Sequence, residues 1–146
     1  KKKKINIRKF NSQDINLKKE LLKPTKIYVK EILNLTQKNL INGCANITGG
    51  GLFNNLSRVI PAGLQANINL DQIKVLKIFK WLKTKNINEN EMLKTFNCGI
   101  GFCLIVKKEN VKQISSFFTK QYMPYQIGHI TKGSKKIRKY EKINWK

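Results

Sequence analysis

The chain has 146 residues, which is room for one domain of ordinary size, and its 30 basic and 8 acidic side chains give a formal net charge of +22. Hydrophobic residues make up 40% of the chain, so a packed core is possible and a wholly disordered chain is excluded. No apolar run is long enough to span a membrane, and the first residue is Lys rather than Met, so we expect a fragment or a processed form.

Hydrophobic periodicity predicts alternating helices and strands along the middle of the chain. Helices are predicted over residues 31–40, 52–60, 71–85, 88–95 and 109–121. An extended piece is predicted over residues 26–30, and strands over 41–48, 64–70, 99–106 and 125–130. The run 99–106 is almost wholly apolar, which favours a central strand. The alternation indicates a single α+β or α/β layered domain with a mixed sheet.

The positive charge comes almost entirely from lysine. Only Arg8, Arg58 and Arg138 are arginines, so 27 of the 30 basic residues are lysines (30 minus 3). Sites that bind phosphates or base edges favour Arg, whose planar fork binds two acceptors at once. Lys, Asn and Ile are abundant together, as AT-rich coding produces, so we do not expect a nucleic acid as partner. Residues 1–20 and 131–146 each carry a net charge of +6, and we interpret them as basic arms beside a domain at 21–130.

Side chains suited to metal binding or nucleophilic catalysis are few. Cys44, Cys98 and Cys103 form no C-x-x-C pair, and with the single His129 they give no zinc set. We therefore predict no metal site, small buried thiols, a structural histidine, and a reducing, cytoplasmic compartment. Residues 21–130 contain only five acidic side chains, too few for a self-contained hydrolase or metal-dependent kinase. The sequence resembles half of an active site.

A first glycine motif joins a predicted strand to a predicted helix. It consists of Thr48 followed by Gly49, Gly50 and Gly51. Glycines allow positive φ and let a ligand approach the backbone, and unpaired amides at the start of a helix favour an anion. Arg58, two turns further, adds a positive charge. A tight turn in which the glycines serve packing alone is the alternative.

A second glycine motif joins a predicted helix to the apolar strand. It contains Asn97, Gly99 and Gly101. An Asn at such a junction can satisfy loop backbone or hold the amide and hydroxyl groups of a ligand. Taken alone, this motif favours the structural interpretation.

The two motifs and the residues around them resemble the phosphoribosylformylglycinamidine cyclo-ligase (aminoimidazole ribonucleotide synthetase) family. They follow the order of the family's C-terminal domain across about residues 20–130. The residues that carry the resemblance are LKPTKIYV at 22–29, ITGGGL at 47–52, Asn55, Leu56, Arg58, Val59, Ile60, Pro61, Phe79, Trp81, Leu82, Met92 and TFNCGIG at 95–101.

The resemblance implies a three-layer α/β/α domain, partly ferredoxin-like, with residues 1–20 as the tail of an interdomain link. It implies an ATP-dependent ligase of purine biosynthesis, in which ATP phosphorylates the amide oxygen of formylglycinamidine ribonucleotide and a nitrogen closes the imidazole ring of aminoimidazole ribonucleotide. An absent N-terminal domain would bind most of the ATP and Mg²⁺ and form a homodimer. The fragment alone is expected to be inactive.

By resemblance, the two motifs bind the substrate or its phosphate. The implied binding residues are Thr48, Gly49, Gly50, Gly51, Asn55, Arg58, Asn97, Gly99 and Gly101. Two positions depart from the family: Asn46 replaces the usual His and Asn54 replaces the usual Glu. An amide can position a group but cannot transfer a proton, so no catalytic residue is assigned.

Three alternatives remain open at this point. One is another ATP-using amide- or selenium-activating enzyme of the same superfamily. A second is a basic module that binds anions or nucleic acid, which the +22 charge motivates. The third is a non-catalytic remnant of the family whose fold survives.

Overall fold

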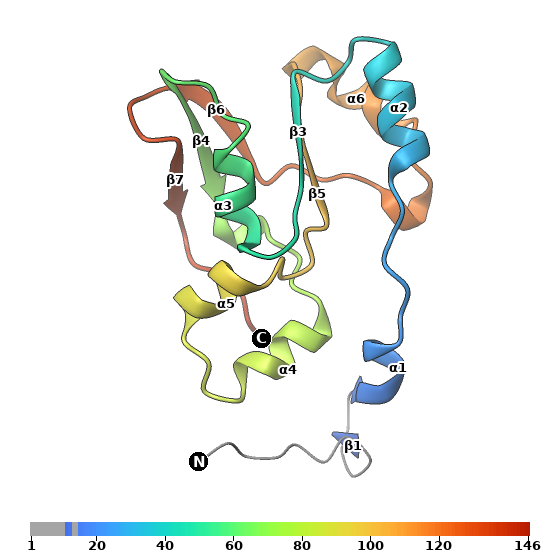
Figure 1. Ribbon diagram of the computed structural model, residues 1–146, viewed down its shortest axis with the longest axis vertical. Coiled ribbons are helices and arrows are strands. Elements are labelled where there is room, and N and C mark those ends of the chain that lie inside the picture. The colour runs from blue at the N-terminus through green and yellow to red at the C-terminus, as the bar shows by residue number, and fades with distance from the viewer. Residues whose placement is uncertain (1–10, 13–14) are drawn as a thin grey trace.

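The computed structural model describes residues 11–12 and 15–146, and it consists of small sheets joined by short helices (Figure 1). β1 (Asn11–Ser12) and β2 (Ile15–Asn16) form an antiparallel pair. β3 (Gly43–Asn46) and β5 (Phe102–Ile105) form a second antiparallel pair. β4 (Leu64–Asn69) lies between β6 (Gly128–Lys132), which is antiparallel to it, and β7 (Ile137–Tyr140), which is parallel. The predicted α+β class and mixed sheet are confirmed.

The helices of the described chain are short. The α-helices are α1 (Leu17–Leu21), α2 (Val29–Gln37), α3 (Gly51–Ser57), α4 (Lys77–Lys83), α5 (Glu89–Thr95) and α6 (Val111–Ser115). Single 3₁₀ turns are η2 (Leu70–Gln72), η3 (Lys108–Asn110) and η4 (Lys120–Tyr122). None of these helices is long and apolar enough to cross a membrane.

Three of the predicted helices are confirmed as α2, α3 and α5. The helix predicted over 71–85 starts only at Lys77: the Asn69 side chain accepts a hydrogen bond from the Asp71 amide and caps the single turn η2, after which Ile73 returns to an extended conformation. Ile73 and Val75 then alternate with exposed Lys74 and are buried in an extended segment. The helix predicted over 109–121 is also shorter than predicted: η3 precedes α6, and only α6 within the predicted range is α-helical.

The apolar run of β5 has a different cause from the one predicted. Among the described residues β5 pairs with β3 alone, so the prediction of a central strand is wrong. Cys103 packs in the main core, whereas Leu104 packs against a second cluster that contains Leu35, Leu40 and Ile114. The strand is apolar on both faces because the β3–β5 pair separates two cores.

Residues 131–146, predicted as a basic tail beyond the domain, take part in the fold. β7 pairs with β4, Ile143 is buried in the main core, and the Trp145 indole donates a hydrogen bond to the Glu89 carboxylate at 2.7 Å. The lysines of this segment dominate its composition, but its apolar residues decide its position.

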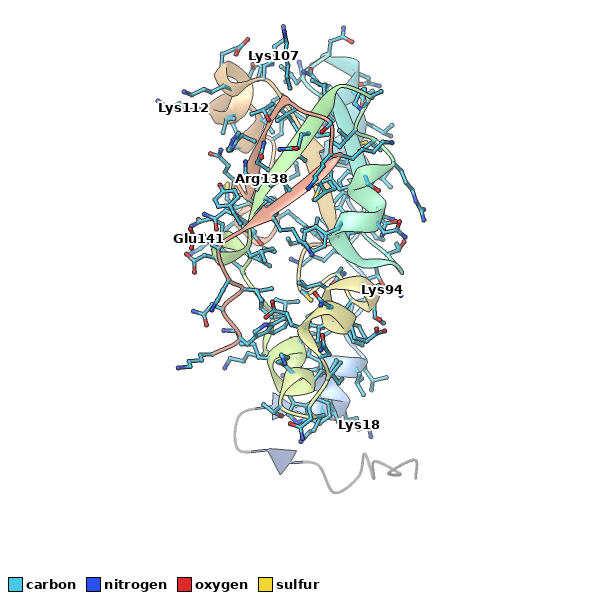
Figure 2. The ribbon with its side chains drawn as sticks, turned by 90° about the vertical axis from the view of Figure 1, so that its left-hand side faces the viewer. Lys18, Lys94, Lys107, Lys112, Arg138 and Glu141 are labelled. Atoms are coloured by element: carbon cyan, nitrogen blue, oxygen red, sulfur yellow. The ribbon has the colours of Figure 1, made fainter. Side chains whose placement is uncertain are left out.

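The basic side chains are spread along the molecule. In Figure 2 the labelled residues Lys18, Lys94, Lys107, Lys112 and Arg138 extend from one end of the chain's long axis to the other. They come from α1, α5, the segment after β5, α6 and β7. A dispersed charge of this kind supports solubility and weak attraction of polyanions more than one specific binding surface.

Candidate functional site

The two glycine motifs lie side by side. Asn46, the last residue of β3, is opposite Phe102, the first residue of β5, and the next backbone hydrogen bond runs from the Ile47 amide to the Gly101 carbonyl at 2.9 Å. The chain therefore leaves β3 through residues 48–51, the first glycine loop, where residues 97–101, the second glycine loop, enter β5. The antiparallel ladder brings together two motifs that are about fifty residues apart in sequence.

Gly50 and Gly51 are required by conformation and by close packing. Their φ angles are 94° and 66°, in the left-handed region that L-residues rarely adopt. A Cβ on Gly51 would overlap the carbonyl oxygen of Leu93, and one on Gly50 would lie 2.6 Å from the Asn54 side-chain nitrogen. The first loop therefore lies directly on α5, whose end leads into the second loop.

Gly49 differs from the two glycines after it. It is exposed, and a Cβ at this position would have no neighbour within 4 Å. In the part of the chain that the structure describes, the backbone amides of Thr48, Gly49 and Gly50 have no hydrogen-bond acceptor. Successive unpaired amides in a turn are a favourable environment for an anion. The first loop thus combines open space with free donors.

Asn55 stabilises the first loop by hydrogen bonds to its backbone carbonyls. Its side chain is only 7% exposed, and its amide nitrogen donates to the carbonyls of Gly51 at 2.8 Å, Gly49 at 3.2 Å and Thr48 at 3.4 Å. These bonds occupy the loop's carbonyl oxygens, while the amides of Thr48, Gly49 and Gly50 have no acceptor among the described residues. The role observed for Asn55 is to shape the loop, and a direct contact with a ligand stays a prediction.

Arg58 lies apart from the first loop. It is exposed at the C-terminal end of α3, whereas the loop precedes the N-terminal end. Seven residues of helix rise by about 10 Å. The structure does not bring Arg58 to the loop, and its contribution to ligand binding stays a prediction.

The second loop has an internal hydrogen bond and packs closely against other segments of the protein. The Asn97 side-chain oxygen accepts a hydrogen bond from the Gly99 amide at 3.0 Å. A Cβ on Gly99, where φ is 109°, would lie 2.8 Å from the Lys74 carbonyl oxygen, and one on Gly101 would overlap the Tyr28 hydroxyl. The glycines of this loop allow close packing, while the amide nitrogen of half-buried Asn97 has no acceptor among the described residues.

The cysteines and the histidine do not form a reactive group with the loops. All three cysteines are free thiols, and burial raises the pKa of Cys98 to about 11 and that of Cys103 to about 12. Both thiols therefore stay protonated near neutral pH. His129 is exposed on β6, opposite Asn67 in the other sheet. Among the described residues, no group of three or more His, Cys, Asp or Glu side chains could hold a metal ion.

Sequence reasoning missed two lysines beside the first loop. A surface hollow of about 230 Å³ is lined by Gly50, Phe53, Asn54, Asn90, Leu93, Lys94 and Lys139. Lys94 comes from α5 (labelled in Figure 2) and Lys139 from β7, with its ammonium 4.8 Å from the centre of the Phe53 ring. Lys94 lies just before the second motif in the sequence, and this position is the one signal that indicates it. Lys139 has no such signal, because the parallel pairing of β7 with β4 leaves no local pattern in the sequence.

Comparison with known proteins identifies the family of the chain. The family model described as "AIR synthase related protein, C-terminal domain" matches residues 2–141. The phosphoribosylformylglycinamidine cyclo-ligase of Alkaliphilus oremlandii is 41% identical over 123 residues, and that of Carboxydothermus hydrogenoformans is 44% identical over 126 residues. Each alignment covers 83% of this chain and 36% of the relative.

A longer relative extends the same pattern. The bifunctional purine biosynthetic protein of Saccharomyces cerevisiae is 44% identical over 102 residues, which cover 69% of this chain and 13% of that protein. The chain thus spans little more than a third of the length of the cyclo-ligases it matches. The resemblance that the two glycine motifs predict is confirmed over most of the chain. The chain belongs to the AIR synthase related protein family and corresponds to its C-terminal domain.

Proposed function

We propose that this chain is the substrate-binding, C-terminal part of an ATP-dependent cyclo-ligase of purine biosynthesis. The proposed reaction converts formylglycinamidine ribonucleotide to aminoimidazole ribonucleotide, by phosphorylation of the amide oxygen and ring closure by a nitrogen. The other products are ADP and phosphate. The names of relatives that are 41–44% identical over most of the chain support this assignment.

One observation about the site carries the proposal: the first loop offers three amides that have no acceptor in the described part of the chain, and an open approach at Gly49. Fixed donors of this kind stabilise charge that develops on a phosphate or an oxyanion without reorganising. Lys94 and Lys139, which line the hollow next to Gly50, add positive charge. Asn97 comes from the adjacent second loop and has an amide nitrogen for a ligand oxygen.

The described residues fit substrate binding better than proton transfer or metal binding. Asn46 is exposed at the end of β3, and its amide can orient a substrate atom but cannot act as a base. No described cluster of carboxylates could hold Mg²⁺. We therefore assign the catalytic base, most ATP and Mg²⁺ contacts, and the homodimer interface to the N-terminal part of the enzyme, and we expect turnover to require that part.

Gly49→Ala tests the proposal with little risk to the fold. The added methyl group has open space within the protein and a φ outside the left-handed region, so the free energy of unfolding should change by less than about 0.5 kcal/mol. In the ligand's approach path, the same methyl should weaken binding of formylglycinamidine ribonucleotide at least tenfold, or by about 1.4 kcal/mol. Titration calorimetry and urea unfolding measure the two quantities.

Gly43→Ala is the matched control, because it adds the same methyl group at the far end of β3, in ordinary contact 3.4 Å from the Ile105 side chain. It should leave ribonucleotide affinity unchanged. Equal affinity of Gly49→Ala and the unmodified chain would remove the first loop from the binding site. Absence of any ribonucleotide binding by the unmodified chain would contradict the proposed function itself.

A further inference from the structure

An exposed apolar surface follows the N-terminal part of the described chain. Nine large hydrophobic side chains of the described residues are more than about a third exposed, and five of them fall within residues 21–33. We call these five the apolar strip: Leu21 (56% exposed), Leu22 (72%), Ile27 (74%), Val29 (61%) and Leu33 (54%). Single exposed apolar residues are ordinary, whereas a cluster of them marks a surface that another molecule covers.

The strip is separate from the side of α2 that faces the core. Val29 and Leu33 are one turn apart on α2 and share a face, while Leu35 is fully buried in the second core. Figure 1 shows α1, the extended segment after it and the start of α2 running along one edge of the molecule. Within the described chain, η4 contacts this edge at Tyr28, where the Tyr122 ring centre lies 5.7 Å from that of Tyr28, and the five side chains of the strip stay more than half exposed.

Tyr28 lies between two residues of the apolar strip and packs against the second glycine loop. It is half-buried between the exposed residues Ile27 and Val29, and its ring centre lies 5.5 Å from that of Phe102. Its hydroxyl occupies the space that a side chain at Gly101 would fill. Desolvation by burial raises the pKa of Tyr28, in agreement with this inward position. Whatever covers Ile27 and Val29 therefore lies beside the residue that packs on the second glycine loop.

The relatives carry a polypeptide segment that could cover this edge. This chain corresponds to a C-terminal domain and to 36% of the Alkaliphilus oremlandii cyclo-ligase, so roughly two thirds of that enzyme has no counterpart here. We propose that the apolar strip is the surface on which this N-terminal part docks, so that its nucleotide-binding machinery faces the glycine loops. The docking proposal rests on the function proposed above.

The charges around the strip specify the docking partner further. From Lys18 to Lys30 the chain has five lysines and one glutamate. A complementary surface would therefore have an apolar centre with an acidic rim. The rim contacts would weaken as salt is added, whereas the apolar contacts would not.

The test uses a chimera in which the N-terminal part of the Alkaliphilus oremlandii enzyme precedes the complete 146-residue chain. Hydrogen exchange of the backbone amides at 22–33 should be at least about tenfold slower in the chimera than in the isolated chain. Val29→Asp should return exchange to the rate of the isolated chain, because it buries a charge in the interface.

Val111→Asp is the matched control. Val111 is also an exposed valine at the first position of a helix, and it lies outside the apolar strip, on α6, which packs with α2 through the second core. Asp is tolerated equally at both helix starts, so each variant should fold. This control should leave exchange at 22–33 as slow as in the unmodified chimera.

The outcomes separate docking from catalysis. Slower exchange without formation of aminoimidazole ribonucleotide would support docking and contradict the proposed function. Unchanged exchange would overturn docking, whether or not the chimera converts the substrate. A concentration-dependent dimer of the isolated chain, detected by sedimentation and abolished by Val29→Asp, would also overturn it by identifying a second copy as the occupant.

Discussion

The two glycine loops use the same residue for different physical purposes. In the first loop, Gly49 faces open space and the amides of Thr48, Gly49 and Gly50 lack acceptors within the described chain. In the second loop, Gly99 and Gly101 each abut another segment of the protein, namely the Lys74 carbonyl and the Tyr28 hydroxyl. The first loop is open toward solvent, whereas the second is sealed by packing.

The difference shows why glycine-rich sequence alone does not identify a binding loop. Both loops contain glycines with positive φ, at Gly50, Gly51 and Gly99. Positive φ reports only that the backbone needs an unusual conformation. Unpaired amides together with space above them distinguish a loop that can receive a ligand from one that serves packing.

Gly51→Ala should have the largest effect on stability. Its methyl group would overlap the Leu93 carbonyl oxygen, and alanine would be forced into the left-handed region at a φ of 66°. Overpacking and left-handed strain together predict a loss of at least about 3 kcal/mol in the free energy of unfolding, measured by urea denaturation.

Gly49→Ala, two residues earlier, is the natural reference for Gly51→Ala, since both substitutions add one methyl group to the same loop. A loss below about 1 kcal/mol for Gly51→Ala would mean that the loop moves away from α5 at little cost. In that case close packing would not constrain Gly51 more than it constrains Gly49.

Asn55→Ala should destabilise the protein more than Asn97→Ala. Asn55 donates to three carbonyls of the first loop, whereas the Asn97 side chain accepts one hydrogen bond within the second loop. We expect losses of about 2 and about 1 kcal/mol in the free energy of unfolding. Asn55→Ala should also weaken ribonucleotide binding, because the free amides lose their fixed arrangement. Asn34→Ala, at an exposed position of α2, is the control with no expected effect.

Several parts of the fold could be predicted from the sequence because their signals are local. Asn88 accepts a hydrogen bond from the Asn90 amide and caps α5, as the predicted helix start requires. The alternation over 64–70 corresponds to β4. The late start of the helix predicted from Asp71 has no such local signal, because Asn69 caps only the single turn η2 and the chain is extended again at Ile73. Whether a capped turn continues as a helix depends on the packing of the residues that follow, here the burial of Ile73 and Val75, which residue type alone does not reveal.

The candidate site was predictable as two motifs, but their chemistry was not. The sequence indicates which residues form the loops, whereas the closeness of the loops depends on the antiparallel register that places Asn46 opposite Phe102. Lys139 reaches the hollow because β7 pairs with β4 in parallel, a long-range contact with no local pattern. The openness of Gly49 depends on what other segments leave uncovered, which requires the complete fold.

The smallest expected effect tests how well the second loop is sealed around Cys98. Its thiol is 2% exposed and donates weakly to the Met92 and Phe96 carbonyls at 3.7 Å, and burial raises its pKa from 9.0 to about 11. The unfolded chain therefore loses this proton first. The stability contributed by the protonated thiol is complete below pH 9 and is lost as the pH rises toward 11.

Comparison of the unmodified chain with Cys98→Ala isolates this contribution, because the lysines and Cys103 titrate in both proteins. The free energy of unfolding of the unmodified chain should fall by about 1 kcal/mol more than that of the variant between pH 9 and pH 10. Chemical denaturation at closely spaced pH values measures the difference. Parallel pH profiles would show that Cys98 reaches solvent in the folded protein. The second loop would then be as open as the first, and packing could no longer be the reason for its glycines.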